Sequence, residues 1–160
     1  MISILIPTHN FDCRPLVKEI HRQATIGKHP FEIIVADDCS TPEFRTINSE
    51  IEQLGHCKYV QLEENVGPAR IRNFLISLAQ YRYCLLMDVD TFPSGDSFMD
   101  KYIKSAKAGS IICGGFIYKR GKDTGVCPLR FKYGIEVEEK DFKVRAKEPY
   151  SQFISMCFLA

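Results

Sequence analysis

Apolar residues in this chain alternate between short continuous runs and stretches in which they recur at helical spacing. The first run spans residues 2–6, with Ser3 as its one polar residue, and ends at Pro7; the second spans residues 31–36, with Glu32 as its one polar residue. The stretch between them places apolar side chains on one face of a helix, at Leu16, Val17, Ile20 and Ala24. Continuous runs of this length are typical of strands buried on both faces, so the pattern predicts strand, helix, strand.

The same alternation continues downstream. Residues 44–54 have helical spacing, and residues 59–62 form another strand-like run. Pro68 suits the first position of a further helix, and residues 83–87 form a buried strand. Repeated strand–helix units with continuous apolar strands predict an α/β fold with a mainly parallel central sheet flanked by helices.

The last third of the chain departs from this alternation. We expect a fourth helix over about residues 94–109, capped by Ser94 or Asp96, and then a strand over residues 110–118. Residues 119–149 are charged and lack periodicity, which favours an irregular segment. A final apolar strand without a polar cap leads us to expect a piece of a longer protein.

Composition limits the class of partner. The chain has 160 residues, enough for one domain with a core, and its 21 basic residues balance 20 acidic ones. No net field therefore favours nucleic acid or a membrane surface. No apolar stretch approaches the roughly 18 residues that cross a bilayer, and the N-terminus lacks a signal-peptide pattern.

The seven cysteines are dispersed, without the spacing of a zinc site or a redox motif. This favours reduced core cysteines and a cytoplasmic location, at most peripheral at the inner face of the membrane. No feature of the sequence specifies an oligomeric state.

Polar groups follow the predicted strands or open the helix beside them. They are Pro7-Thr8-His9-Asn10, Asp37-Asp38, Asn65-Val66-Gly67 with Arg70 and Arg72, and Asp88-Val89-Asp90. Since parallel sheets bind ligands at the carboxyl ends of their strands, we expect these groups to share one site. Asp88 and Asp90 can aim at one cation, because Mg²⁺ prefers one or two carboxylates together with phosphate oxygens. The sequence thus predicts a metal-bridged diphosphate, with Mn²⁺ or Mg²⁺ held by Asp90 and Asp88.

At these groups the chain resembles the family 2 glycosyltransferases, which have the Rossmann-like GT-A fold. The matching segments are Ser-Ile-Leu-Ile-Pro-Thr-His-Asn, Glu-Ile-Ile-Val-Ala-Asp-Asp-Cys-Ser-Thr, Glu-Asn-Val-Gly-Pro-Ala-Arg-Ile-Arg-Asn and Leu-Leu-Met-Asp-Val-Asp, in the family's order. The resemblance runs from Ile2 to about Tyr118. It implies a donor-binding βα region over residues 1–118. Residues 119–160 would begin the acceptor side of the same, incomplete domain.

The resemblance also implies roles at the nucleobase. Thr8 would touch the base and Asp38 would accept its imide N–H. Pro7, Asn10 and Asp37 belong to the same nucleotide-binding set. A carboxylate at this edge favours uracil, because cytosine in its usual tautomer has no N–H there. The expected donor is therefore a UDP-sugar.

Further roles are implied at the diphosphate. Arg72 would steady the base or the diphosphate, Asp88 would lie near the ribose, and Asp90 would bind the metal. A divalent ion there offsets the charge that develops on the leaving nucleoside diphosphate. The implied activity is metal-dependent, inverting transfer of the sugar to a carbohydrate or lipid-linked acceptor, as in polysaccharide biosynthesis.

One part of the family pattern is missing. Inverting members need a general base, an Asp well beyond the metal motif, and nothing marks any acidic residue from Glu136 to Asp141 as that base. We assign no catalytic base and expect it beyond Ala160. His9 is expected to line the pocket rather than to act as a base.

Two alternatives remain open at this point. Residues 85–92 also fit the nucleophile motif of the haloacid-dehalogenase-like phosphatases, in which Asp88 would attack phosphorus and Asp90 would be the acid/base. That motif normally opens its fold, which counts against this interpretation. The second alternative is a nucleotide-binding module without catalysis.

Overall fold

The computed structural model describes residues 1–118, 127–151 and 153–160. Its contacts divide the chain into two compact units. The first consists of Met1–Ile112 together with Met156–Ala160, and the second is Cys113–Ser155. The C-terminal strand thus belongs to the first unit, and the expected division of donor and acceptor roles after residue 118 stays a prediction.

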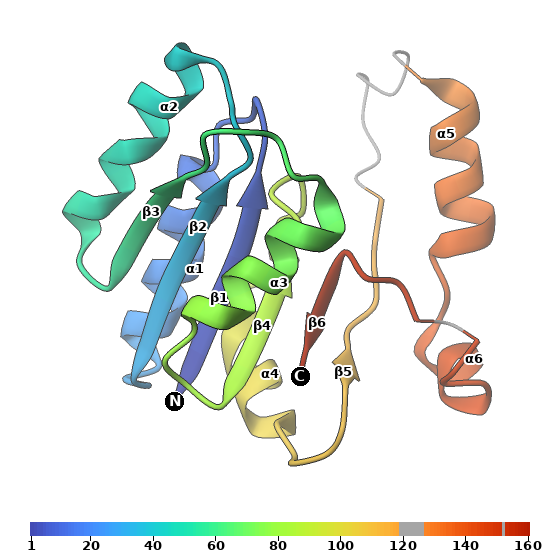
Figure 1. Ribbon diagram of the computed structural model, residues 1–160. Helices are drawn as coiled ribbons and strands as arrows, with labels where there is room; N and C mark the ends of the chain where they lie inside the picture. Colours follow the sequence, from blue (N-terminus) through green and yellow to red (C-terminus); the bar gives the residue numbers. More distant parts are fainter. Residues whose placement is uncertain (119–126, 152) are drawn as a thin grey trace. The chain divides into compact units, whose positions relative to one another are not determined.

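A six-stranded sheet has the order β3-β2-β1-β4-β6-β5 (Figure 1). Its strands are β1 (Ile2–Thr8), β2 (Phe31–Asp37), β3 (Cys57–Gln61), β4 (Tyr83–Met87), β5 (Ile112–Cys113) and β6 (Cys157–Leu159). The pairs β1–β2, β1–β4 and β2–β3 are parallel, whereas β6 runs antiparallel to β4. The mainly parallel sheet predicted from the continuous apolar runs is confirmed.

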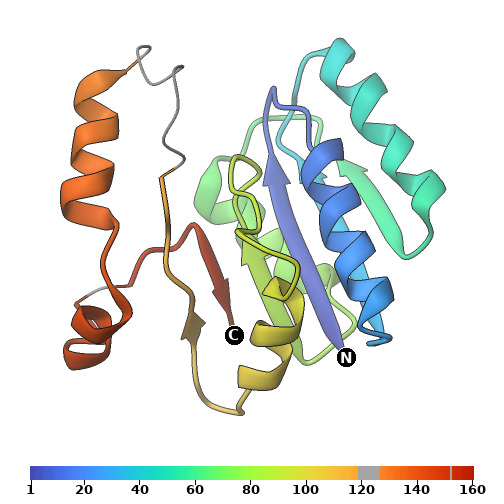
Figure 2. The same ribbon diagram turned by 180° about the vertical axis from the view of Figure 1, so that it is seen from behind.

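Helices cover both faces of this sheet. They are α1 (Arg14–Ile26), α2 (Pro42–Ser49) with the 3-10 helix η1 (Glu50–Leu54), α3 (Pro68–Leu78) and α4 (Phe98–Ser105). α3 packs against β1 and β2 on one face, and α1 and α4 lie side by side on the other (Figures 1 and 2). The apolar stripe predicted on α1 is buried. None of the helices in the described part of the chain is long and apolar enough to cross a membrane.

Strand register brings the polar segments to one edge. Leu5 of β1 pairs with Ile34 of β2 and with Leu86 of β4, and all three are buried under α3. Further along the same strands, Thr8 pairs with Asp37. The carboxyl ends of β1, β2 and β4 are thus aligned, which places the residues that follow them at one edge.

The region after β4 differs from the sequence-based expectation. α4 begins at Phe98 rather than near residue 94, because the preceding turn is held to α1: Gln23 Nε2 donates to the Gly95 carbonyl at 3.0 Å, and Arg22 pairs with Asp96. The strand expected over residues 110–118 is reduced to the two residues of β5.

The second unit is helical rather than irregular, and this corrects our prediction for residues 119–149 where they are described. It contains α5 (Pro128–Tyr133), a π-helical turn η3 (Gly134–Glu138) and α6 (Phe142–Lys147). Segments this short show no periodicity over a helical window. Their start signals were present, since Pro128 opens α5 and the Asp141 carboxylate accepts from the Lys143 N–H. Residues 119–126 lie outside the described part.

Candidate functional site

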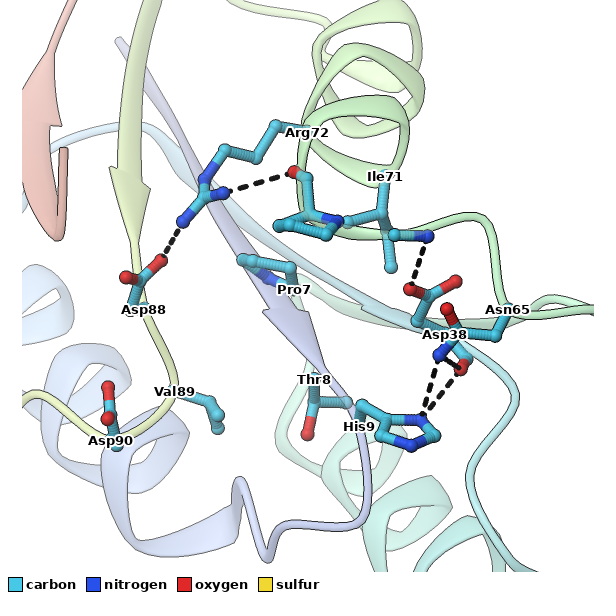
Figure 3. A pocket seen from close by; sticks show the side chains of 12 residues that line it. Pro7, Thr8, His9, Asp38, Asn65, Ile71, Arg72, Asp88, Val89 and Asp90 are labelled. Carbon is cyan, nitrogen blue, oxygen red and sulfur yellow. Dashed lines mark hydrogen bonds and ion pairs between the residues drawn. The ribbon is translucent and has the colours of Figure 1, made fainter.

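A cavity of about 360 Å³ lies at the carboxyl ends of β1, β2 and β4 (Figure 3). Its lining comes from the ends of these strands, from the loop before α3 and from the first turns of α3. The lining residues are Pro7, Thr8, His9, Asp38, Asn65, Gly67, Pro68, Ile71, Arg72, Asp88, Val89 and Asp90. Each of the four polar segments contributes residues to this one cavity, and their roles toward a ligand stay predictions.

Most of the residues that we selected from the sequence line this cavity. These are Pro7, Thr8, Asp38, Arg72, Asp88 and Asp90. Asn10 and Asp37 do not line it. His9 lines it, as expected.

Asp37 is the clearest correction. It is 0% exposed, its Oδ1 accepts from the Ser40 N–H at 2.6 Å, and its Oδ2 accepts from the Tyr59 hydroxyl. A fully buried carboxyl group with both oxygens engaged has no surface for a nucleotide. We therefore remove Asp37 from the residues expected to touch the ligand.

Asn10 connects two loops instead of facing the cavity. Its backbone has a left-handed conformation with φ of 49°, which Asn tolerates better than most residues. The Asn10 N–H donates to Ser40 Oγ at 2.8 Å, and Asn10 Oδ1 accepts from the Thr41 N–H at 2.8 Å. Asn10 thereby ties the loop after β1 to the loop after β2.

Asp38 fixes the loop that precedes α3. Its Oδ1 accepts from the Val66 N–H at 2.7 Å, and its Oδ2 accepts from the Gly67 N–H at 2.9 Å. Each carboxylate oxygen has a second lone-pair position. Asp38, which is 5% exposed, can thus hold this loop and still accept a hydrogen bond from a ligand in the cavity.

His9 is held at the same end of the cavity by its ring nitrogens. Nδ1 lies 2.8 Å from the Asp38 carbonyl oxygen, and Nε2 lies 3.1 Å from Asn10 Nδ2. A carbonyl can only accept, so we place the ring proton on Nδ1, which leaves Nε2 to accept from the Asn10 amide. Asn65 Nδ2 donates to the same Asp38 carbonyl at 3.1 Å. These bonds suit a lining residue better than a base.

At the other end of the cavity, Arg72 links α3 to the end of β4. Its guanidinium donates to the Pro68 carbonyl at 3.1 Å and forms an ion pair with Asp88 (Figure 3). Burial raises the pKa of Asp88 above its ordinary value, the Arg72 charge opposes this shift, and the Asp90 charge adds to it. Asp90 is exposed and forms no side-chain hydrogen bond or ion pair with any described residue.

The donor set fits a divalent cation bound jointly with a ligand. Among the described residues there is no group of three or more His, Cys, Asp or Glu side chains that could hold a metal by itself. Two carboxylates are sufficient where phosphate oxygens and waters complete the coordination of Mg²⁺. Asp90 is the better-placed donor, because Arg72 already engages Asp88.

Two lining residues were not expected at the site from the sequence. Pro68 was expected only to open a helix, and Ile71, which is 1% exposed, belongs to the core under α3 and also borders the cavity. Asn65, Gly67 and Val89, which belong to the polar segments selected from the sequence, line the cavity as well.

In the second unit, the neighbouring acidic residues Glu138 and Glu139 are both engaged by other residues. Glu138 accepts from the Tyr118 hydroxyl and from Arg130 Nη1, and Glu139 accepts from the Tyr118 N–H at 3.1 Å. The Tyr118 hydroxyl, supported by Arg130, holds the pKa of Glu138 below its ordinary value. A low pKa makes Glu138 a weak general base.

Comparison with known families gives one match that spans nearly the whole chain. The family model described as "Glycosyl transferase family 2" matches residues 3–158. Among curated proteins, TuaG, a glycosyltransferase assigned to teichuronic acid biosynthesis in Bacillus subtilis, is 34% identical over 92 residues, which cover 56% of this chain and 36% of TuaG. The poly(ribitol-phosphate) β-N-acetylglucosaminyltransferase TarS of Staphylococcus aureus is 30% identical over 101 residues, or 61% of this chain and 18% of TarS.

Solved structures agree on the fold. Residues 1–349 of S. aureus TarS in complex with UDP-GlcNAc match with a TM-score of 0.55 and 27% identity, over 64% of this chain and 30% of that one. A mannosyltransferase from Pyrobaculum calidifontis, PcManGT, matches in fold with a TM-score of 0.54 and 19% identity, over 64% of this chain and 31% of that one. The chain thus spans about a third or less of the length of these relatives.

Proposed function

The chain belongs to glycosyl transferase family 2, and from this premise we propose that it binds a nucleoside-diphosphate sugar, in particular a UDP-sugar, for transfer of the sugar to an acceptor. Family membership confirms the resemblance and, with the matched structures, the GT-A fold. It also removes the phosphatase interpretation of the Asp88-Val89-Asp90 segment.

One observation carries the proposal: a carboxylate suited to recognise a nucleobase and a cluster of one arginine and two carboxylates border the same cavity. Asp38 borders one end, and Arg72, Asp88 and Asp90 border the other. A nucleoside diphosphate needs both kinds of partner: a hydrogen-bond acceptor for the base, and positive charge for the phosphates. The proposed orientation therefore places the base near Thr8 and Asp38.

Uracil is the base that Asp38 favours. With its oxygens bonded to two backbone N–H groups, Asp38 stays an acceptor and would receive the N3–H of uracil. The bound nucleotide of the matched TarS structure is UDP-GlcNAc, which supports the same base for this chain.

At the phosphate end, we assign Asp90 to the metal and Asp88 to the ribose side. A bound Mn²⁺ or Mg²⁺ would supply Lewis-acid stabilisation of the leaving nucleoside diphosphate. Arg72 holds Asp88 in place and contributes positive charge next to the phosphates. Asp90 keeps its carboxylate free for the cation.

A second candidate function is nucleotide-sugar binding without transfer by these residues alone. It is favoured by Glu138 and Glu139, whose carboxylates are occupied by Tyr118 and Arg130 instead of being free to accept a proton. We propose that the acceptor is a carbohydrate or a lipid-linked molecule, and that the base for inverting transfer lies beyond Ala160. We also propose a cytoplasmic location, supported by the seven cysteines, all of which are free thiols.

Thermal unfolding with a panel of nucleotides tests the proposal. UDP or a UDP-sugar with Mn²⁺ is expected to stabilise the chain by about 2.7 kcal/mol at a concentration one hundred times Kd. GDP and ADP should stabilise it less at the same concentration. Failure of every nucleoside diphosphate to stabilise the chain, with or without Mn²⁺, would contradict the proposed function.

A further inference from the structure

Asp37 is a fully buried carboxyl group that the proposed function does not use. It is the last residue of β2, pairs in register with Thr8 and directly precedes Asp38. Its hydrogen-bond donors come from two different elements. One is the N–H of Ser40 in the loop after β2, and the other is the hydroxyl of Tyr59 on β3.

From this carboxyl group a chain of hydrogen bonds crosses to the loop after β1. Asp37 holds the Ser40 N–H at 2.6 Å, and Ser40 Oγ accepts from the Asn10 N–H at 2.8 Å. A second bond joins Asn10 to the loop after β2, because Asn10 Oδ1 accepts from the Thr41 N–H at 2.8 Å. The loop that carries His9 is thereby fastened to the loop that begins with Asp38.

The Tyr59 hydroxyl is suited to a permanent donor role. Tyr59 is 9% exposed, and burial, together with its hydrogen bond to Asp37, raises the pKa of Tyr59 above its ordinary value. The phenol therefore keeps its proton over the range in which proteins are handled. Two fully buried residues on neighbouring elements, Asn48 and Cys13, also lie near the Tyr59 hydroxyl. The Cys13 N–H donates to Asn48 Oδ1 at 3.0 Å, and this bond adds support to the loop after β1.

We propose that Asp37 and Tyr59 form a positioning pair that orders the two loops at the nucleobase end of the cavity, and thereby sets the placement of Asp38 and His9. The pair acts through the Ser40 and Asn10 contacts and touches no ligand. The ordering of the loops is independent of the proposed function, and only its effect on recognition of the nucleobase rests on that function. Binding residues must be held within about 0.5 Å of their productive geometry, and buried hydrogen bonds from a supporting layer supply that restraint.

The test variant is Tyr59→Phe, which removes one hydroxyl and leaves the ring in the core. The matched control is Tyr102→Phe, which removes the hydroxyl of another buried tyrosine, one that lies 3.4 Å from the Cys157 carbonyl on β6. Two measurements are made on residues 1–160: amide hydrogen exchange in the two loops, and calorimetric binding of UDP and of inorganic pyrophosphate, each with Mn²⁺.

Tyr59→Phe is expected to speed exchange of the Asn10, Ser40 and Thr41 amides. It should also weaken UDP binding about 5- to 50-fold and leave pyrophosphate binding unchanged, because pyrophosphate lacks the base. Tyr102→Phe should lower the thermal midpoint without either effect.

Unchanged loop exchange in Tyr59→Phe would overturn the inference. So would an unchanged UDP Kd alongside a lowered thermal midpoint, since the pair would then only stabilise the fold. If the unmodified chain binds no UDP, the proposed function fails instead, and loop exchange alone decides whether Asp37 and Tyr59 order the loops.

Discussion

Arg72 on α3 forms an ion pair with Asp88 at the end of β4, and this pair gives the two carboxylates of the Asp-Val-Asp segment different surroundings. The side chains of Arg72 and Asp88 are 22% and 26% exposed, so the pair is largely shielded from solvent. Asp90, two residues later, is exposed and forms no such contact with the described residues. The first carboxylate is thus fixed by a protein cation, and the second is free for an external one.

Asp90→Ala is accordingly expected to abolish the metal-dependent part of UDP binding, because it removes the free carboxylate oxygens that a hard cation prefers. Asp96→Ala is the matched control: its exposed carboxylate lies on the same loop but pairs with Arg22, so UDP binding should stay metal-dependent. Calorimetry with and without Mn²⁺ measures both. Equal UDP affinity of the unmodified chain with and without metal would contradict this assignment.

Asp38→Ala should weaken UDP binding by roughly 10- to 150-fold, the equivalent of about 1.5–3 kcal/mol for a charge-assisted hydrogen bond. Because Asp38 also accepts from the Val66 and Gly67 N–H groups, the variant should lose stability as well. Weak purine-nucleotide binding and pyrophosphate binding with Mn²⁺ should change little. Tighter binding of GDP than of UDP by the unmodified chain would show that the base assignment is wrong.

Gly67→Ala should destabilise the chain by about 1–3 kcal/mol. Gly67 has φ of 82° and ψ of 168°, a backbone region that is essentially restricted to glycine. Gly95→Ala is the matched control, because no heavy atom lies within 4 Å of an added Cβ at either position and only Gly67 has a positive φ. Urea denaturation of both variants compares the two costs. Equal losses would indicate that the Gly67 conformation relaxes freely.

The order of strands and helices in the first unit could be predicted because the central strands β1, β2 and β4 are mainly apolar runs, and segments with helical spacing separate the strands. The roles of Asp37 and Asp38 could not be separated in the same way, since they are identical neighbours in sequence. Only the register with β1 and the position of Tyr59 show that one carboxyl group is buried and the other borders the cavity.

Contacts between distant segments were likewise beyond sequence patterns. The Arg72–Asp88 pair depends on how α3 crosses the sheet, and a single sequence contains no signal for that crossing. The short helices α5 and α6 were missed for a different reason, since six residues are too few to establish a period.

Stability should depend on acid pH through Glu19. The Arg22 guanidinium, with Gln23, lowers the pKa of Glu19 from its ordinary value of 4.5 to about 2. As the pH falls, the Glu19 carboxylate therefore becomes protonated in the unfolded chain before it does so in the folded chain. The stability that its ion pair contributes is fully present above pH 4.5 and is lost as the pH falls toward 2. Urea denaturation at about pH 5 and about pH 3 should show a smaller acid loss for Glu19→Gln than for the unmodified chain. Glu64→Gln, at an exposed carboxylate, is the control and should retain the full loss.

Residues 1–160 should bind a UDP-sugar without transferring the sugar to an acceptor. The proposed donor contacts all lie between Thr8 and Asp90 and border one cavity. Among the acidic residues of the second unit, Glu138 and Glu139 are engaged by Tyr118, so neither is free to take a proton from an acceptor hydroxyl.

The expected loss in the rate of sugar transfer follows from what a general base and an acceptor site contribute to catalysis. General base catalysis supplies about 10²–10⁴-fold, and positioning of the acceptor can supply more. Slow hydrolysis of the donor would survive the loss of both, because water needs no built acceptor site. A radiolabelled UDP-sugar assay with a panel of acceptors separates the two reactions. Saturable transfer would reveal a base within the chain. Glu136 would then be the first residue to replace, because it is exposed and its 3.9 Å separation from Lys132 Nζ is longer than a hydrogen bond.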